Sequence, residues 1–302
     1  MKTIKLTSYS VAIALGIAFF VGCAKDEPEA IVLPPIGGFN SANEVGAADL
    51  LAYWPLEGNG IESKSSTAPN ATVGASYEAG AKGQGLKLAN GYLKYPSIGA
   101  LSTSLTSFSI STWAKVKNNG TSASVFLSLT RPNEWAGNIN FLAETGWKPA
   151  TIDSLAVKGL IVSDNTIGWQ DSRNTTKLDQ GMITENAANP TAIQHAAFPN
   201  IVGGQWAQSV ITWDATTRLF KVYSNGVKIS NPKWEERGAP NGMMLNFYTP
   251  TTPIIGAFGD IATTIEPWNK AMTGSLDEIR IWKKALNAAD VKALYELEKA
   301  NR

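Results

Sequence analysis

The stretch LFKVYSNGVKIS, residues 219–230, predicts a β-hairpin. Two short segments rich in β-branched and aromatic residues flank the dipeptide Asn225-Gly226. Asn-Gly is typical of a type I′ turn, because both central residues of that turn need a positive φ angle. The chain is therefore expected to contain antiparallel strands joined by tight turns.

Outward from this hairpin, most segments follow the same pattern. They are short, rich in Ser, Thr, Val, Ile and aromatic residues, and separated by Gly, Asn, Pro or Asp. Residues 108–116 predict a strand with Phe108 and Ile110 on one face and Trp113 on the other. One short C-terminal helix is expected after the N-cap Asn287, covering one end of the fold. The fold class is all-β, an antiparallel sandwich.

Five blocks then stand in a characteristic order along the chain. They are residues 51–60 (LAYWPLEGNG), 81–88 (AKGQGLKL), 108–115 (FSISTWAK), 205–227, which end in the hairpin, and 274–286 (GSLDEIRIWKKAL). Together they resemble the strand motifs of LamG-like domains in the concanavalin A-like lectin/glucanase superfamily. The resemblance implies a two-sheet antiparallel jelly-roll sandwich. Two residues depart from the pattern: Gln208 stands where histidine is frequent, and Glu62 stands near where the first loop often carries an aspartate.

The same resemblance implies a structural calcium ion near the end of the sandwich. Its side-chain ligand would be Asp277 of the closing strand, with Asn59, Glu62 or Asn90 nearby and backbone carbonyls completing the shell. Oxygen ligands gathered from distant segments are what calcium requires. The alternative is that Asp277 only caps or hydrogen-bonds the end of a strand.

Signatures of an enzyme are poor. Glu278 and Arg280 lie two apart on one strand face, which favours an ion pair over an acid/base role. The single histidine, His195, has no marked partners for a Ser-His-Asp relay, and adjacent Glu235-Glu236 would point to opposite faces of a strand. The closely spaced E-x-D-x-E run of laminarinase-like glycosidases is missing from the sequence. We interpret the protein as a non-enzyme.

The ten tryptophans fall into two groups. Five lie within the strand blocks and are expected to pack. The others occur in connections rich in Gly, Pro and Asn, where an aromatic plane can stack on a sugar ring while polar neighbours bond its hydroxyls. We predict a ligand site that includes Trp135 and Trp169 first, then Trp147, Trp234, Trp268, Arg131 and Asn138. The alternative for any one tryptophan is that it pins a long loop onto the sandwich.

The N-terminus has the pattern of a secretion signal. Lys2 and Lys5 precede an uncharged, mainly apolar run, residues 11–21, which is too short to span a bilayer comfortably. Cys23 follows and is the only cysteine. This arrangement resembles a lipobox, in which the cysteine would be lipidated; the alternative is an incidental or buried thiol.

These features predict three parts of the chain. They are a lipoprotein signal peptide over residues 1–22, a lipid-anchored acidic, Pro- and Gly-containing linker over 23–44, and a LamG-like domain over 45–302. Residues 24–29 resemble a surface-export signal or serve as a solvated tether, and the stretch from there to Asn43 is expected to form no core.

Basic and acidic residues are nearly balanced, so the sequence does not favour a highly charged partner of either sign. Removing Lys2 and Lys5 with the signal leaves 24 basic residues against 25 acidic ones, so neither nucleic acid nor an anionic membrane surface is an expected partner. The leading hypothesis is non-catalytic polysaccharide or glycan binding by an outer-membrane lipoprotein exposed at the cell surface. Such a protein would help a neighbouring glycan transporter or hydrolase. The alternatives are a protein-interaction or adhesion module and, third, a glycosidase or lyase with an unrecognised site.

Overall fold

The computed structural model describes one compact unit that runs from Pro35 to Arg302. The described residues are 33–103, 105–132, 134–162, 168–175, 202–230, 235–237, 251–259, 261 and 268–302. Three residues singled out in the sequence, Cys23, His195 and Trp234, lie outside them, as does the predicted signal peptide.

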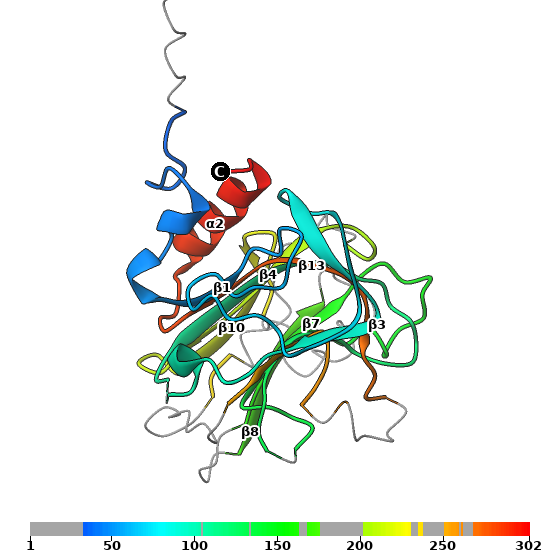
Figure 1. The fold of residues 1–302 in the computed structure, drawn as a ribbon. Coiled ribbons are helices and arrows are strands. Elements are labelled where there is room, and N and C mark those ends of the chain that lie inside the picture. The colour runs from blue at the N-terminus through cyan, green and yellow to red at the C-terminus, as the bar shows by residue number, and fades with distance from the viewer. Residues whose placement is uncertain are drawn as a thin grey trace, which may run out of the picture. The chain divides into compact units, whose positions relative to one another are not determined.

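The unit is built from antiparallel strands, as expected (Figure 1). The ladder runs β11-β10-β9-β4-β13-β3-β12-β5-β6-β7-β8, with β1 added on β13 and β2 on β3. The strands are β1 (Leu50–Trp54), β2 (Ala71–Ala79), β3 (Gln84–Lys94), β4 (Phe108–Lys115), β5 (Ser124–Leu129), β6 (Ile139–Ala143), β7 (Ala156–Val162), β8 (Trp169–Thr175), β9 (Ala207–Asp214), β10 (Leu219–Ser224), β11 (Val227–Lys228), β12 (Pro253–Ile255) and β13 (Met272–Trp282).

This ladder curls over so that two layers face each other. The long strand β3 joins the layers, because Leu86 and Leu88 pair with β13 whereas Leu93 pairs with β12. Across the interior, Gly159 on β7 leaves space for the ring of Phe220 on β10, which lies 2.5 Å from where a Cβ would stand. The two layers enclose one main apolar core, as a jelly-roll sandwich requires.

The hairpin at residues 219–230 is confirmed. Strands β10 and β11 pair through Tyr223 and Ser224, and Asn225 and Gly226 have φ angles of 48° and 76°. Both central residues are therefore left-handed, as a type I′ turn needs. The strand predicted over 108–116 is β4, which ends one residue earlier.

The predicted helix is α2 (Ala288–Lys299), and the side chain of Asn287 caps it by accepting a hydrogen bond from the N–H of Asp290 at 2.9 Å. It packs on the face of β4, β9 and β13 that turns away from the main core, rather than over an end of the sandwich. Aromatic contacts hold the helix on this face, where Trp113 of β4 stacks on Tyr295 of α2 with 5.6 Å between ring centroids. Among the described residues, no helix has the length and apolarity that a membrane crossing requires.

The stretch up to Asn43 was expected to form no core, and this is wrong for its last part. Ala42 is buried, and Ile36 and Phe39 pack against the apolar cluster under α2. Apolar side chains among the glycines and prolines explain the difference. Three short 3₁₀ helices complete the fold: η1 (Ala42–Glu44), η2 (Ala47–Asp49) and η3 (Gly99–Leu101).

Candidate functional site

Three of the predicted loop tryptophans meet in one aromatic cluster. Trp135 lies 5.2 Å from Trp169 and 4.9 Å from Trp268, measured between ring centroids. Phe258 completes the cluster at 5.1 Å from Trp135, edge-on. These four rings come from three separate parts of the chain, namely the connection after β5, the start of β8 and the connection between β12 and β13, so the fold and not local sequence brings them together.

The cluster rests on the sheet face that turns away from the main core. On this part of the sheet, Phe141 and Ile161 point into the core, so the alternate residues Leu142 and Leu160 point outward. Trp135 packs against two small apolar clusters on this outward face, one around Leu142 and one around Leu160. Its ring is thereby fixed to the sheet and supports the other aromatic rings.

A cavity of about 260 Å³ opens between these rings and the sheet. Trp135, Phe258 and Trp268 form its aromatic wall. Leu142 and Leu160 line it from the sheet. Apolar walls of this kind, with a few polar groups at the margin, are usual in small-molecule sites.

The polar margin consists of Glu144 and Lys158. The ammonium of Lys158 lies 3.0 Å from the carboxylate of Glu144 and 3.6 Å from that of Asp171 on β8. It also lies 5.9 Å from the ring centroid of Trp147, in cation–π range. The fourth described loop tryptophan, Trp147, is thereby placed beside the same cavity.

The four tryptophans differ in how much of each side chain is open to a ligand. Trp147, Trp169 and Trp268 are 52%, 50% and 39% exposed. Trp135 is only half-buried and is surrounded by three rings. The exposed rings can stack on a ligand, whereas Trp135 positions them.

The two predicted polar residues have separate surroundings. Arg131 donates from Nε to the carbonyl of Ala136 at 2.8 Å and lies 3.6 Å from Glu134, which holds the loop around Trp135. Asn138 is fully buried, and neither polar atom of its amide has a hydrogen-bond partner among the described residues. The structure therefore places Arg131 as a loop support and leaves Asn138 beneath the surface.

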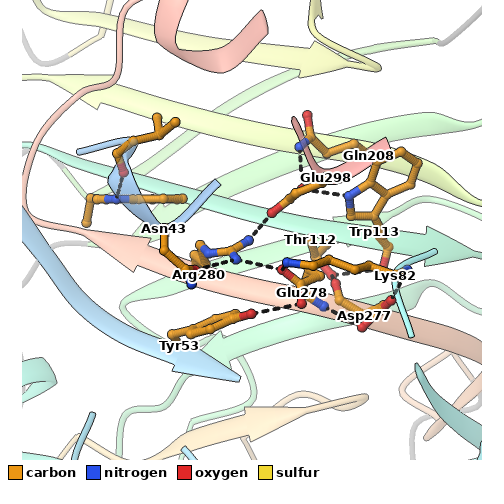
Figure 2. A network of polar contacts seen from close by, with 12 residues as sticks. Asn43, Tyr53, Lys82, Thr112, Trp113, Gln208, Asp277, Glu278, Arg280 and Glu298 are labelled. Atoms are coloured by element: carbon orange, nitrogen blue, oxygen red, sulfur yellow. Dashed lines mark hydrogen bonds and ion pairs between the residues drawn. The ribbon is translucent and has the colours of Figure 1, made fainter. Parts of the chain in front are cut away.

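A second polar arrangement lies under α2, centred on Arg280 (Figure 2). Its guanidinium lies 2.6 Å from the carboxylate of Glu278, contacts that of Glu298 and donates to Asn43 at 3.2 Å. The ring of Tyr53 lies below it, 4.1 Å away. Arg280, Glu278 and Glu298 are each 1% exposed, so this is an enclosed ion-pair network, as the spacing of Glu278 and Arg280 predicted.

The same network fastens α2 to the sheet. Glu298 accepts hydrogen bonds from the indole N–H of Trp113 at 2.6 Å and from the amide of Gln208 at 2.8 Å (Figure 2). Gln208, which departs from the usual histidine, therefore serves as a donor to the helix. The charged groups of Arg280, Glu278 and Glu298 are buried and therefore closed to a ligand.

A second hollow, of about 460 Å³, is lined in part by Glu78, Lys87, Lys115 and Ser275. Lys115 contacts the carboxylate of Glu78, and Ser275 donates to it at 2.8 Å. These hydrogen bonds, that of Lys115 first, lower the pKa of Glu78 from 4.5 to about 2. Lys115 also lies 5.2 Å from the ring centroid of Trp206.

With this geometry in hand, the chain can be placed among known proteins. Residues 87–292 match the family described as the concanavalin A-like lectin/glucanases superfamily. The chain belongs to this superfamily. Its jelly-roll fold, expected from five sequence blocks, is confirmed. No curated protein matches the chain.

Solved structures share the fold of this superfamily member at low sequence identity. The binding domain of Paraclostridial Mosquitocidal Protein 1 is 15% identical with a TM-score of 0.52, over 82% of this chain and 52% of that one. The ligand binding domain of botulinum neurotoxin serotype D, in complex with N-acetylneuraminic acid, is 13% identical with a TM-score of 0.50, over 84% and 52%. The chain thus spans about half the length of these two toxin domains.

A third structure is domain 4 of AbnA, a GH43 extracellular arabinanase from Geobacillus stearothermophilus, in complex with arabinotriose. It is 18% identical with a TM-score of 0.49, and the match covers 82% of this chain and 98% of that one. At such identities these likenesses show the fold alone.

The calcium ligands that the superfamily resemblance implied each have other partners. The carboxylate of Glu62 accepts from the backbone N–H groups of Tyr53 at 2.7 Å and Ser65 at 2.7 Å, so it closes its own loop. Asn59 accepts from the N–H of Ile61 at 3.0 Å within the same loop.

Asn90 and Asp277 also have partners of their own, and these partners differ. The side-chain oxygen of Asn90 accepts a hydrogen bond from the hydroxyl of Thr273 at 3.2 Å. Asp277 accepts from the N–H groups of Lys82 and Glu278 at 3.0 and 2.8 Å, and burial raises its pKa to about 8. Within the described residues no three His, Cys, Asp or Glu side chains are grouped to hold a metal ion. Each of the four candidates thus has a partner within the protein, and the structural calcium ion stays a prediction.

Reasoning from sequence missed six of the eight lining residues of the aromatic cavity, among them Glu144, Lys158 and Phe258. Glu144 and Lys158 do lie within residues 131–200, the segment from which the polar candidates came. The signal for Lys158 is its position inside an otherwise apolar segment, AVKGLIV, where an alternating pattern turns it away from the core.

Proposed function

We propose that this protein binds a polysaccharide or glycan, without catalysis, in the cavity between Trp135, Phe258 and Trp268 and on the exposed rings of Trp147 and Trp169 beside it. The observation that carries the proposal is a cavity with a charged margin that is lined by two tryptophans, Trp135 and Trp268, while two exposed tryptophans, Trp169 and Trp147, contact its lining residues Trp135 and Lys158. Exposed aromatic planes stack on the apolar faces of sugar rings, and carboxylates accept bonds from their hydroxyls.

Two further points support this proposal. A toxin domain that shares the fold was solved with a sugar, N-acetylneuraminic acid, so the fold is compatible with a sugar ligand. The sequence also lacks the closely spaced E-x-D-x-E run of the glycosidases of this architecture, which favours a binding role over hydrolysis.

The N-terminal sequence supports a location for this activity. Lys2, Lys5, the apolar run 11–21 and the single Cys23 favour a lipid-anchored protein of the cell envelope, held in the outer membrane and exposed at the cell surface. There it would hold a glycan close to a neighbouring transporter or hydrolase.

Affinity electrophoresis of residues 24–302 in gels containing single polysaccharides tests the proposal. This chain keeps the whole compact unit that begins at Pro35. We expect retardation by at least one polysaccharide, lost in a Trp147→Ala/Trp169→Ala double variant. The control Val227→Ala changes a side chain that is 44% exposed in the hairpin and should be retarded like the parent.

Two results would contradict the proposal. Unchanged retardation of the double variant would place the glycan elsewhere. No retardation across a broad panel would favour a protein-interaction or adhesion role.

A further inference from the structure

We infer that the aromatic cavity takes an uncharged glycan and excludes acidic ones, because the ammonium at its margin is already paired with two carboxylates. This inference rests on the proposed glycan-binding function and names the chemical class of its ligand.

The cation that lines the cavity is already neutralised. Lys158 lies within 3.0 Å of Glu144 and 3.6 Å of Asp171, and its side chain is 16% exposed. The second carboxylate has a further partner, since Arg237 donates from Nε to the carbonyl of Asp171 at 2.7 Å and lies 3.9 Å from its carboxylate. Among the side chains that the structure describes here, the ammonium of Lys158 is thus paired with two carboxylates, and Asp171 also has Arg237 beside it.

An acidic sugar would bind unfavourably beside Lys158. To reach Lys158, its carboxylate would have to replace Glu144, whose side chain is only 12% exposed, and leave that group without its cation. It would also stand close to the carboxylate of Asp171. Both effects oppose an anion, and neither opposes a neutral ring.

An uncharged sugar suits the same groups. A carboxylate has several acceptor positions, and one ammonium cannot fill them all. Glu144 and Asp171 can therefore accept hydrogen bonds from the hydroxyls of a sugar while they remain paired with Lys158. Trp147 and Trp169 are about half exposed, and their rings lie beside Lys158 and Trp135 respectively. The described arrangement is therefore an aromatic platform with acceptors, in which the lining cation is already paired.

The test compares neutral polysaccharides (arabinan, β-glucan, galactomannan) with acidic ones (polygalacturonate, alginate) by affinity electrophoresis at low and high salt. It uses the parent chain 24–302, Trp169→Ala and Asp171→Asn. Asp171 is suitable because its side chain is 37% exposed, so the folding of this variant should be preserved. Glu296→Gln on α2 removes one negative charge away from the cavity and is the matched control.

We expect a neutral polysaccharide to retard the parent and the control, with loss in Trp169→Ala. Asp171→Asn should bind the neutral glycan about tenfold more weakly, because a hydrogen bond to a charged group is lost. It should also gain salt-sensitive retardation by an acidic polysaccharide.

Other outcomes separate the two proposals. Retardation of the parent mainly by acidic polysaccharides, lost in Trp169→Ala, would overturn the uncharged ligand and leave glycan binding standing. Equal affinity of Asp171→Asn and the parent for the neutral glycan would overturn the role of the charged margin. No retardation by any polysaccharide would overturn both.

Discussion

At the scale of single residues, the two tryptophans predicted first have different roles. Trp169 is half exposed and touches the cluster through one neighbour, Trp135. Trp135 itself contacts three rings and two apolar clusters on the sheet. Loss of either ring should reduce binding, but only loss of Trp135 should reduce stability.

Trp169→Ala should leave the free energy of unfolding within about 0.5 kcal/mol of the parent, as is usual for surface positions. Its affinity for the glycan should fall by about 2 kcal/mol, the loss typical of an aromatic residue that dominates an interface. Trp135→Ala should be destabilised by about 3 kcal/mol, because it empties a packed position. Urea unfolding and electrophoresis of both variants measure these effects, and equal stability of the two variants would contradict this division of roles.

Glu78 should make stability depend on pH in the acid range. Its pKa is lowered from 4.5 to about 2 by Lys115 and then Ser275, so the carboxylate stabilises the folded state fully above pH 4.5. That contribution is lost as pH falls through the interval to about 2. Glu78→Gln should therefore be less stable than the parent at pH 7, and the difference should shrink toward pH 2. A constant difference in unfolding free energy across this range would refute it.

The sequence identified tryptophans in loops as candidate ligand-binding residues, but it did not show which other residues would lie beside them. Trp135 and Trp169 stand in turn-rich sequence, which marked them as candidates. Glu144 and Lys158 became part of the cavity only because strands β6 and β7 pair in one register, with Leu142 opposite Lys158. That register depends on contacts between segments and leaves no local signal.

At the scale of elements, the closing strand and the terminal helix act as one piece. In β13 the register shifts between Asp277 and Arg280, and Glu278 adopts a φ of 51°, which is left-handed and uncommon for a non-glycine residue. The bulge lets Glu278 and Arg280 meet under α2, where Glu298 completes the network.

Removal of Glu298 should therefore detach the helix. Glu298→Ala leaves Arg280 with one buried carboxylate and removes the acceptor of Trp113, at a cost of about 3 to 5 kcal/mol. Glu296→Ala, two residues earlier on the same helix, should change stability by about 0.5 kcal/mol or less. Thermal unfolding of both variants checks this, and similar midpoints would show that the network contributes little.

Local elements followed from sequence, whereas the bulge did not. The Asn225-Gly226 turn and the Asn287 cap each depend on a few adjacent residues, and both are confirmed. The bulge at Glu278 arises from pairing with β4 and from the helix above it, so an even alternation along the strand could not predict it.

At the scale of the whole molecule, the packed unit begins earlier than predicted. Residues 36–44 pack on the helix, the N–H of Ala42 donates to the carbonyl of Arg302, and Asn43 binds Arg280. The resemblance located the strands but carried no information on this segment, because it lies ahead of the first matching block.

Two truncations should show this boundary. A chain that starts at Pro35 should unfold at the same temperature as one that starts at Ala24. A chain that starts at Gly46 should unfold about 5 °C lower, because it exposes apolar surface of α2 and of Trp282. Equal midpoints for all three chains would mean that residues 36–45 add nothing to stability.

The places where the compact unit begins and ends have one more consequence. Residues 36–44 and the C-terminus lie together beside α2, whereas β8, which carries Trp169 and Asp171, lies on the side of the unit away from α2 (Figure 1). A molecule held by its N-terminal linker would thus present its aromatic cavity outward, and so would each identical neighbour. Many copies on one surface could then grip a single polymer at successive points, and this avidity would retain a polysaccharide for which each cavity alone has only weak affinity.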